Sequence, residues 1–441
     1  MSSKPFVIKK RVSNFNKVIS VSGDKSISIR WVLFSSLANG ISKAKNLLIS
    51  KDVLASIKAI KKLGIKVKFN KGICEIKGNG VNGYKYKRNL TIDAQNSGTL
   101  GRLILGFLIN TPYPIKLIGD ESLSKRDFKR ITDPLSKFGA KFNLTNYKNL
   151  PLTIFGSDKL KPIFFKEKKG SAQCKSAVIL GGMRVKGITK IKAKRSRNHT
   201  ELLSKYLKLP IVVKNKKNHD LIKIKQIKKI RPINYEIPSD ISSSAFFMVL
   251  TVLTKKSKLL IKNVNVNPSR TGIISILKMM GVKIYLKNKK TYKGEKKADI
   301  QIVNTQNLSA INCPSNLNSS AIDEFLLIFL VAAKAKGVSY FKNLSELNEK
   351  ESPRLEWGAK ILKKIGIKTI VTKDSIKIFG NPNIKIDKKI IIKNYLKDHR
   401  IFMTCVIAAL SFEGNSIWKI YDKDSIKSSF PEFLNIIKKF T

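Results

Sequence analysis

Short polar segments that directly precede predicted helices hold the residues best suited to chemistry. Residues 22–30 (SGDKSISIR) place Lys25, Ser26 and Arg30 at the beginning of one helix. A helix N-terminus presents free N–H groups and a partial positive charge, so it favours phosphate and carboxylate groups. An ammonium, a hydroxyl and a guanidinium at such an end predict binding of a small molecule that carries both groups. On local pattern alone, a solvated helix cap with flanking charges explains the segment equally well.

A second turn of the same kind spans residues 96–102 (NSGTLGR). Gly98 allows the backbone to approach a ligand closely, and Arg102 follows one helical turn later. Arg126 stands downstream, at the end of residues 119–126 (GDESLSKR). Each of these segments alone is weak evidence, because a glycine-rich turn is more often only a turn.

Further candidates stand at other predicted helix starts. Ser171 and Gln173 supply uncharged donors in residues 171–176 (SAQCKS). The second half holds residues 240–244 (DISSS), 267–272 (NPSRTG), 323–324 (DE), 350–354 (KESPR) and 398–400 (DHR). Taken separately, the lysine and glutamate of KESPR could form a surface ion pair, and DHR could be a capped helix start.

Length and composition predict two globular domains. A chain of 441 residues exceeds the size at which one hydrophobic core stops growing, and 42% hydrophobic residues suffice to fill two cores. The net charge of +58 by itself indicates a polyanionic partner such as nucleic acid. The lysines are spread over the whole chain, however, and Lys, Asn and Ile are abundant together, which favours a compositional origin. Either way, the positive field attracts small phosphorylated substrates.

Other classes of protein are disfavoured by what the sequence lacks. The longest apolar run, residues 325–333, is much shorter than the roughly 18 residues of a membrane span. The N-terminus has no apolar signal segment, and the cysteines (Cys74, Cys174, Cys313 and Cys405) form no C-x-x-C pair. The three histidines lack the spacing of metal ligands. We therefore expect a soluble, cytoplasmic protein with reduced cysteines and no metal site.

One pattern recurs along the chain: a helix, a glycine, and a short strand in which apolar residues alternate with lysine. The glycines are Gly64, Gly139, Gly281 and Gly366, and residues 206–212 form a copy without one. Glycine suits the position after a helix, and the alternation suits a half-buried strand. We expect about six such helix–strand units, three in each half. Residues 29–37 predict a first helix with one apolar face that ends at Gly40, and Ser50 or Asp52 begins a second that ends at Gly64.

The order and spacing of these motifs resemble the EPSP synthase family over residues 19–433. Its signatures correspond to residues 23–30, 96–99, 350–354 and 398–400. Residues 171–178 (SAQCKSAV) and 197–201 (RNHTE) are most similar to the class II branch.

The resemblance implies an α/β fold with two domains, the inverse α/β barrel-like enolpyruvyl transferase fold, with three repeated helix–sheet units in each domain. We expect an N-terminal domain over residues 20–238 and a C-terminal domain over residues 239–441, which residues 1–19 join. In the family, helix N-termini of both domains point into the cleft between them. The N-terminal domain is expected to bind mainly shikimate 3-phosphate.

The resemblance also implies the reaction: the enolpyruvyl group of phosphoenolpyruvate moves to the 5-hydroxyl of shikimate 3-phosphate, in the pathway to chorismate and the aromatic amino acids. The residues that correspond to shikimate 3-phosphate ligands are Lys25, Ser26, Arg30, Ser171, Ala172, Gln173, Asp323 and Lys350. Those that correspond to phosphoenolpyruvate ligands are Lys25, Gly98, Arg126, Gln173, Arg354 and Arg400. Asp323 is the expected base, assisted by Lys25, and Glu351 the expected acid.

No metal or organic cofactor is expected, and neither a nucleic acid nor a membrane partner; the expected state is a monomer. Glyphosate is an inhibitor of the family at the phosphoenolpyruvate site, and the glycine at position 98 leaves room for it. Ser428 occupies the place where many members carry a phosphate-binding lysine, and Lys427 stands one residue early.

Two other classes of protein compete with this interpretation. The enzyme of the same fold that acts on UDP-N-acetylglucosamine uses a loop cysteine, and residues 94–126 contain none. A basic nucleic-acid-binding protein is expected to show a basic stripe with interleaved aromatic residues, which the sequence lacks.

Overall fold

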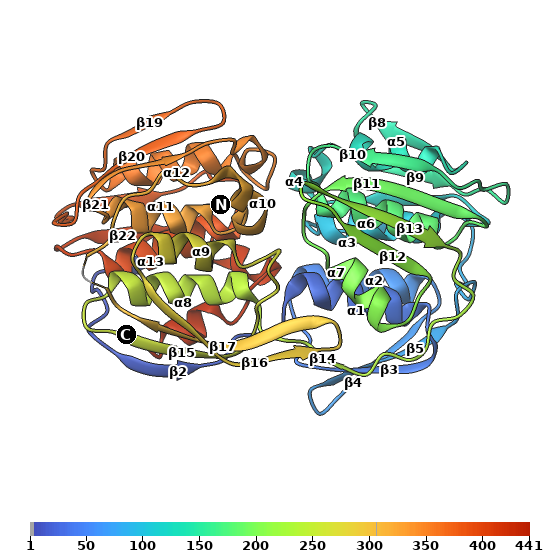
Figure 1. Ribbon diagram of the computed structural model, residues 1–441, viewed down its shortest axis with the longest axis horizontal. Coiled ribbons are helices and arrows are strands. Elements are labelled where there is room, and N and C mark those ends of the chain that lie inside the picture. Colours follow the sequence, from blue (N-terminus) through green and yellow to red (C-terminus); the bar gives the residue numbers. More distant parts are fainter. Residues whose placement is uncertain (1–3, 306) are drawn as a thin grey trace. The chain divides into compact units, whose positions relative to one another are not determined.

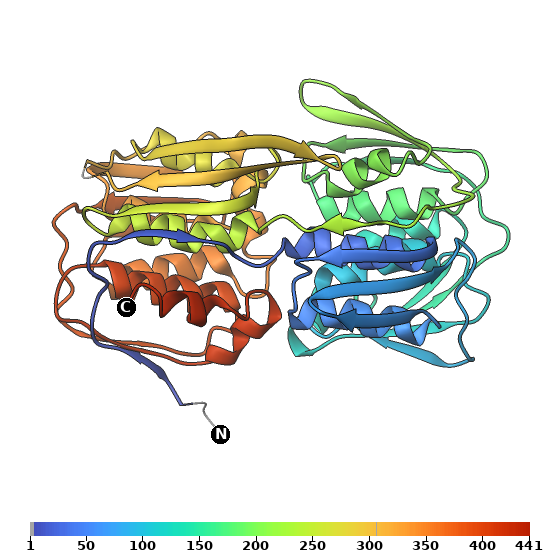
Figure 2. The same ribbon diagram turned by 90° about the horizontal axis from the view of Figure 1, so that it is seen from below.

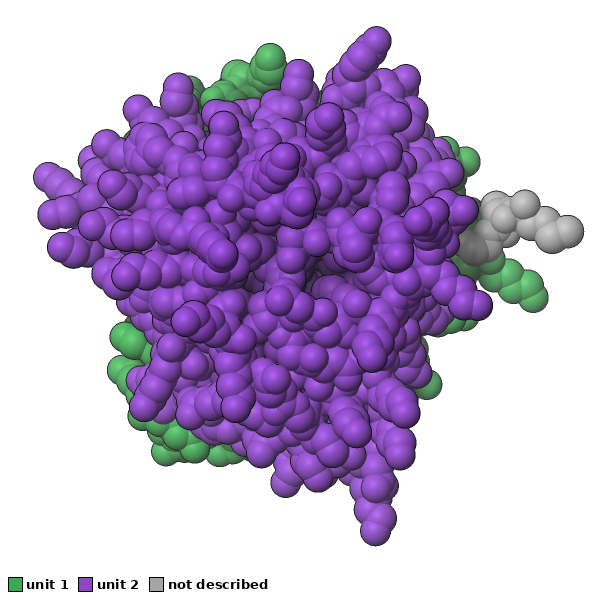
Figure 3. Space-filling model, turned by 90° about the vertical axis from the view of Figure 1, so that its right-hand side faces the viewer, with its two compact units in different colours: residues 1–22, 238–290, 296–441 green, residues 23–237, 291–295 purple. Residues whose placement is uncertain are grey.

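The computed structural model describes residues 4–305 and 307–441 and divides into two compact units. The N-terminal unit consists of Gly23–Ile237 and Thr291–Glu295. The C-terminal unit consists of the residues up to Ser22, Pro238–Lys290 and Lys296–Thr441. Figure 3 colours the two sets of residues separately.

The N-terminal unit contains three four-stranded sheets in its described residues, and all three share one plan. In each sheet the second strand pairs in parallel with the first and antiparallel with the third, which in turn pairs antiparallel with the fourth. The first sheet is β14 (Tyr235–Glu236), β3 (Asn39–Lys45), β5 (Ile73–Asn79) and β4 (Lys66–Asn70). The second is β6 (Leu90–Asp93), β7 (Ile115–Ile118), β9 (Asn149–Phe155) and β8 (Lys141–Thr145). The third is β10 (Phe164–Glu167), β11 (Ile188–Lys194), β13 (His219–Lys225) and β12 (Ile211–Asn215).

The C-terminal unit also contains three sheets among the described residues. The first is β16 (Lys283–Tyr292), β17 (Glu295–Val303), β15 (Lys258–Asn265) and β2 (Asn16–Ile19). The second is β18 (Gly337–Phe341), β20 (Ile376–Gly380) and β19 (Thr369–Val371), and the third is β1 (Phe6–Ile8), β22 (Ile417–Ile420) and β21 (Lys389–Ile392). The N-terminal segment supplies β1, which pairs antiparallel with β22, and β2, which pairs parallel with β15. Figure 2 shows β2, in blue, beside β15.

In each unit, three helices of the described residues are buried on almost every side. The helices of the N-terminal unit are α1 (Lys25–Ser36), α2 (Lys51–Lys62), α3 (Gly98–Leu108), α4 (Glu121–Ser124), α5 (Lys129–Ser136), α6 (Ala172–Gly182) and α7 (His199–Tyr206). Of these, α1, α3 and α6 lie inside the sheets (Figure 1). The single apolar face expected for the first helix is therefore wrong, since even Ser28, Arg30 and Ser35 of α1 are buried. That helix also ends at Ser36, and Gly40 lies within β3.

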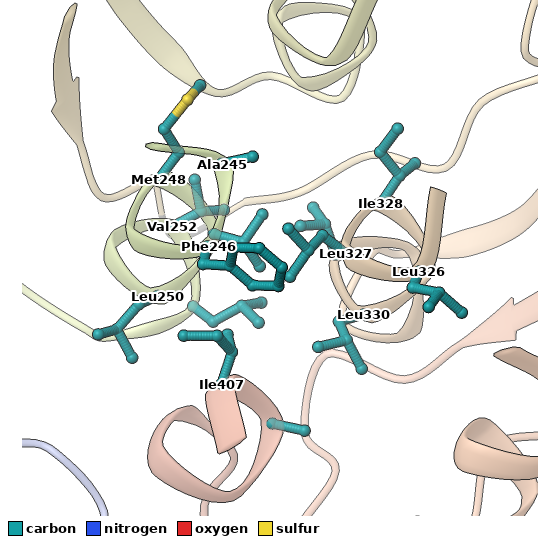
Figure 4. Packing of buried hydrophobic residues seen from close by; sticks show 14 of the residues in the cluster. Ala245, Phe246, Met248, Leu250, Val252, Leu326, Leu327, Ile328, Leu330 and Ile407 are labelled. Atoms are coloured by element: carbon teal, nitrogen blue, oxygen red, sulfur yellow. The ribbon is translucent and has the colours of Figure 1, made fainter. Parts of the chain in front are cut away.

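The C-terminal unit repeats this arrangement. Its helices are α8 (Ile241–Leu253), α9 (Gly272–Met279), α10 (Asn318–Ala321), α11 (Phe325–Ala333), α12 (Arg354–Lys364), α13 (His399–Ser411) and α14 (Phe433–Ile437), with short 3-10 turns η1 (Ser315–Leu317), η2 (Ser345–Leu347) and η3 (Lys423–Ser428). Figure 4 shows Phe246 of α8, Leu327 of α11 and Ile407 of α13 packed against one another. Side chains of α8, α11 and α13 belong to the hydrophobic core of the unit. Burial of each such side chain stabilises the fold by about 1.5–3 kcal/mol.

The expected helix–glycine–strand repeat is confirmed. All four glycines have positive φ, from 85° at Gly64 to 122° at Gly139, a region that residues with a Cβ avoid. In the copy without glycine, Lys208 also has a positive φ, of 57°. The predicted helix between Ser50 and Gly64 is α2, with Ser50 as its N-cap.

Among the described residues no single helix combines the length and apolar character needed to cross a membrane. The segments Ser315–Ala321 and Phe325–Ala333 meet that criterion only as a pair, and they are bent by 120°.

Candidate active site

The first predicted motif occupies the N-terminus of α1. Asp24 caps the helix, since its Oδ1 accepts a hydrogen bond of 2.9 Å from the backbone N–H of Ile27. The Nζ of Lys25 lies 2.9 Å from Oδ2 of Asp52, in the first turn of α2. The side chain of Lys25 keeps 21% of its surface exposed, and Ser26 follows it in the same turn. A partly exposed ammonium therefore stands at a helix N-terminus, where an anion is favoured.

Arg30 lies deeper, one turn into α1, and ties three helices together. Its Nε donates to Oγ1 of Thr200 at 2.8 Å, its Nη1 to the backbone oxygen of Ser26 at 3.0 Å, and its Nη2 to Oγ of Ser176 at 3.2 Å. Burial lowers the pKa of the guanidinium to about 10, and the negative charge of Glu201 acts in the opposite direction. Arg30 thus links α1 to α6 and α7 near the N-terminal ends of these helices.

The N-termini of α3 and α6 are joined by a chain of polar side chains. Gly98 is the first residue of α3, and Ser97 caps it. Gln173, in the first turn of α6, donates from Nε2 to Oγ1 of Thr99 at 3.0 Å, and its Oε1 accepts a bond of 2.5 Å from Nη1 of Arg102. Two further helix N-termini are therefore neighbours in the same unit.

Ser171 and Ala172 complete this end of α6. Ser171 is the N-cap, and its Oγ accepts a hydrogen bond from the backbone N–H of Cys174 at 3.3 Å. Both residues remain partly exposed.

Arg126 lies beside the N-terminus of α3. Its Nη2 donates to Oδ1 of Asn96 at 3.2 Å, and Asn96 donates in turn to Asp120 at 2.7 Å. A Cβ added to Gly98 would lie 3.2 Å from Nη1 of Arg126. The glycine and the arginine predicted from separate motifs are therefore in contact distance.

Arg354 is the centre of a charged cluster in the C-terminal unit. It begins α12 with a side chain that is 2% exposed. Its Nε donates to Oδ2 of Asp398 at 2.9 Å, its Nη1 to Oδ1 of Asp323 at 3.4 Å, and its Nη2 pairs with Glu351. Burial acts to lower the pKa of Arg354, but the carboxylates of Asp398, Glu351 and Asp323 outweigh it and raise that pKa.

Asp398 serves two structural purposes at once. As the N-cap of α13 its Oδ1 accepts a bond of 2.9 Å from the backbone N–H of Arg400, and its Oδ2 accepts one of 2.8 Å from Oγ of Ser352. Burial acts to raise the pKa of Asp398, but the charge of Arg354 prevails and lowers it. The structure therefore confirms that the DHR motif begins a capped helix, and its part in the site stays a prediction.

Asp323 is surrounded by three cationic side chains. Its carboxylate lies 3.7 Å from Nζ of Lys350, 3.4 Å from Arg354 and 3.9 Å from Arg400, and its backbone oxygen accepts a bond of 2.7 Å from Nη1 of Arg400. The side chains of Lys350, Glu351 and Asp323 are exposed by 27%, 17% and 14%. This group combines a reachable carboxylate pair with cations that can hold an anionic substrate.

The predicted site residues thus form two groups. Lys25, Ser26, Arg30, Gly98, Arg126, Ser171, Ala172 and Gln173 lie in the N-terminal unit, and Asp323, Lys350, Glu351, Arg354 and Arg400 in the C-terminal unit. Sequence reasoning did not assign the residues that hold these side chains, among them Asp52, Asn96, Thr200 and Asp398. Asp52 and Asp398 carried a signal, since both stand at predicted helix starts.

The C-terminal lysine lies in a different environment. Lys427 belongs to η3, where its Nζ pairs with Asp424 at 2.9 Å and both side chains are mostly exposed. Ser428, at the place of the family's lysine, lies 3.1 Å from Nδ1 of His399.

The arrangement of sheets and helices is the enolpyruvyl transferase fold. The structure resembles the enolpyruvyl transferase NikO from Streptomyces tendae, with a TM-score of 0.76 over 99% of this chain and 98% of that one. At 13% sequence identity this likeness shows the fold alone. The predicted fold class is therefore confirmed.

The family follows from three closer comparisons. Residues 9–437 match the family EPSP synthase (3-phosphoshikimate 1-carboxyvinyltransferase). A 3-phosphoshikimate 1-carboxyvinyltransferase from Ruthia magnifica subsp. Calyptogena magnifica is 41% identical over 98% of this chain and 96% of its own length. The solved structure of EPSP synthase from Acinetobacter baumannii has a TM-score of 0.85 and 33% identity, over 99% of this chain and 98% of that one. The chain belongs to the EPSP synthase family, as the motifs predicted.

Proposed function

We propose that the two groups of residues described above carry out the reaction of the family. The chain transfers the enolpyruvyl group of phosphoenolpyruvate to the 5-hydroxyl of shikimate 3-phosphate, which releases phosphate and gives 5-enolpyruvylshikimate 3-phosphate. The observation that carries this function is the match to the family over residues 9–437, a span that includes both groups. The enzyme is a transferase of the shikimate pathway.

Shikimate 3-phosphate is assigned mainly to the N-terminal unit. Its ligands there are Lys25, Ser26, Arg30, Ser171, Ala172 and Gln173. The partly exposed ammonium of Lys25 and the N-termini of α1 and α6 supply positive potential for the phosphate. Arg30 is assigned by its match to the family signature, and its buried bonds to Thr200 and Ser176 link α1 to α7 and α6.

Phosphoenolpyruvate carries a phosphate and a carboxylate, and the guanidinium groups of Arg126, Arg354 and Arg400 can pair with them in two-pronged fashion. Arg126 is partly exposed beside Gly98. From the resemblance to the family, Lys25 and Gln173 are expected to contact both substrates, and each stands at a helix N-terminus in the N-terminal unit.

Proton transfer is assigned to the carboxylates of the C-terminal unit. Asp323 takes the proton of the 5-hydroxyl, assisted by Lys25 and held near Lys350, while the oxygen forms a bond to C2 of phosphoenolpyruvate and Glu351 gives a proton to C3. In the second step the bond from C2 to the phosphate oxygen breaks, C3 returns a proton to Glu351, and the leaving phosphate takes up the proton held by Asp323. The atoms balance without a cofactor, because phosphate is the leaving group.

We further propose that the chain works as a monomer in the cytoplasm, with phosphoenolpyruvate and shikimate 3-phosphate as its partners. The four cysteines are buried and unpaired, in keeping with a reducing compartment.

Mass spectrometry of the product tests the proposal. After incubation of the purified protein with both substrates, shikimate 3-phosphate should be replaced by a species heavier by one enolpyruvyl group. An unchanged mass of shikimate 3-phosphate in the presence of folded protein would refute the proposed function.

A further inference from the structure

A buried polar cluster adjoins Asp323 and Arg400, and the roles assigned above do not use it. It consists of Arg270, Ser242 in the first turn of α8, and Glu324, which directly follows Asp323. Arg270 donates from Nη2 to Oγ of Ser242 at 2.7 Å, and the same hydroxyl donates to Oε1 of Glu324 at 2.5 Å. The exposed fraction is 2% for Arg270, 4% for Ser242 and zero for Glu324.

The direction of these hydrogen bonds follows from the donor inventory. A guanidinium can only donate and an ionised carboxylate can only accept, so Ser242 accepts from Arg270 and gives its single proton to Glu324. The hydroxyl therefore joins a buried cation to a buried anion in one fixed orientation. Arg270 is also paired with Asp240, the N-cap of α8, at 3.4 Å.

Glu324 connects this cluster to the candidate site. Its Oε1 lies 3.8 Å from Nη1 of Arg400, and the same nitrogen donates to the backbone oxygen of Asp323 at 2.7 Å. The guanidinium of Arg400 is thus held by two consecutive residues, through a backbone oxygen and a buried charge. Burying a charge costs free energy unless an opposite charge or a hydrogen bond compensates for it. The guanidinium of Arg400 therefore stays in the orientations that keep its contacts with Glu324 and with the backbone oxygen of Asp323.

We propose that Glu324, fixed by Ser242 and Arg270, is a positioning residue that sets the orientation of the Arg400 guanidinium toward phosphoenolpyruvate. The inference rests on the proposed function, since it concerns the substrate assigned to Arg400. The side chain of Glu324 is fully buried and faces Arg400, through which it acts.

Glu324→Gln is the most conservative test, because the amide keeps the size of the side chain and an oxygen for Ser242 but removes the charge facing Arg400. It should raise the KM for phosphoenolpyruvate at least about tenfold, which corresponds to about 1.4 kcal/mol. The KM for shikimate 3-phosphate should change less than about twofold. A merely structural role would not produce this separation of the two constants.

A double-mutant cycle with Arg400→Ala shows whether Glu324 acts through that arginine. If it does, adding Glu324→Gln to Arg400→Ala should change the KM for phosphoenolpyruvate by less than about twofold. Ser242→Ala is the second variant, in case Glu324→Gln fails to fold, and should show the same separation of the constants in weaker form. Ser244→Ala is the matched control: it also removes a buried hydroxyl from α8, but Ser244 donates to the backbone oxygen of Asp240 instead.

The outcomes separate this inference from the proposed function. A wild-type protein that does not convert shikimate 3-phosphate would refute the function. If the wild type is active, either of two results would overturn the inference. One is additive effects of Glu324→Gln and Arg400→Ala in the double-mutant cycle. The other is equal changes in the KM values for the two substrates in Glu324→Gln and Ser242→Ala. Changes confined to phosphoenolpyruvate and absent in Ser244→Ala support it.

Discussion

Replacing Gly98 by alanine adds one methyl group at the N-terminus of α3, directly beside two arginines. The new Cβ would lie 3.2 Å from Nη1 of Arg102, 3.2 Å from Nη1 of Arg126 and 3.6 Å from Cδ1 of Leu123. Ordinary van der Waals contacts of this kind measure 3.4–4 Å, so both guanidinium groups must move by a few tenths of an ångström. The backbone itself tolerates the change, because Gly98 is not among the residues with positive φ.

The size of the effect follows from what Arg126 is assigned to bind. A hydrogen bond to a charged group contributes about 1.5–3 kcal/mol, or a factor of about 10 to 150 in affinity. A shift of a few tenths of an ångström weakens such a bond without abolishing it, so the KM for phosphoenolpyruvate should rise only several-fold. Glyphosate is larger and needs the space that the methyl group fills, so its inhibition constant should rise at least about tenfold, because packed sites respond to a single added methyl group.

The assay is a series of inhibition measurements on both proteins at fixed shikimate 3-phosphate. Wild type should be inhibited by glyphosate in competition with phosphoenolpyruvate. Gly101→Ala is the control, because its Cβ would be equally crowded, at 3.3 Å, but by the ring of Phe128. An unchanged inhibition constant in Gly98→Ala, or a wild type that tolerates millimolar glyphosate, would refute the reasoning.

Three other predictions concern the charged residues. Asp323→Ala and Glu351→Ala should each lower kcat at least about 100-fold while the protein stays folded, and activity within a few-fold of wild type would exclude that residue as acid or base. Arg126→Ala should raise the KM for phosphoenolpyruvate more than the KM for shikimate 3-phosphate, because losing a charged partner costs roughly 2–5 kcal/mol. Steady-state kinetics with each substrate varied in turn measure both constants. A larger rise in the KM for shikimate 3-phosphate would show that the assignment is wrong. Arg354 lowers the pKa of Asp398 in the folded protein, so the ion pair stabilises the fold at any pH above the usual aspartate pKa of about 4. This stabilisation is lost as the pH falls through the lower pKa of the folded state. Asp398→Asn should therefore be less stable than wild type at pH 7, by roughly 3 kcal/mol, and chemical denaturation should show the difference shrinking in acid; a constant difference would contradict the linkage.

The repeat was predictable because it depends on local chemistry. A helix followed by a residue with positive φ and a half-buried strand leaves a mark in any short segment, as at Gly64 and Gly366. Lys208 shows the limit of that signal, since it also has a positive φ although it is not a glycine. The pairing of β1 with β22 joins residues at opposite ends of the chain, such as Phe6 and Ile420, and no local pattern carries it.

The site divides in the same way. Residues at helix N-termini could be recognised because capping and anion binding restrict their types, and Lys25, Gly98 and Gln173 lie at such positions. The depth of burial could not be read from the motifs: Arg30 and Arg354 are enclosed by partners that come from distant segments. The apolar spacing in the first helix predicted one buried face, whereas a helix inside a ring of sheets is buried all round.

Release of phosphate from phosphoenolpyruvate tests the central claim most directly. The purified protein should release phosphate only when shikimate 3-phosphate is present, one phosphate for each 5-enolpyruvylshikimate 3-phosphate formed. UDP-N-acetylglucosamine in its place should give no release. Release without shikimate 3-phosphate, or release that UDP-N-acetylglucosamine supports equally well, would contradict the assignment.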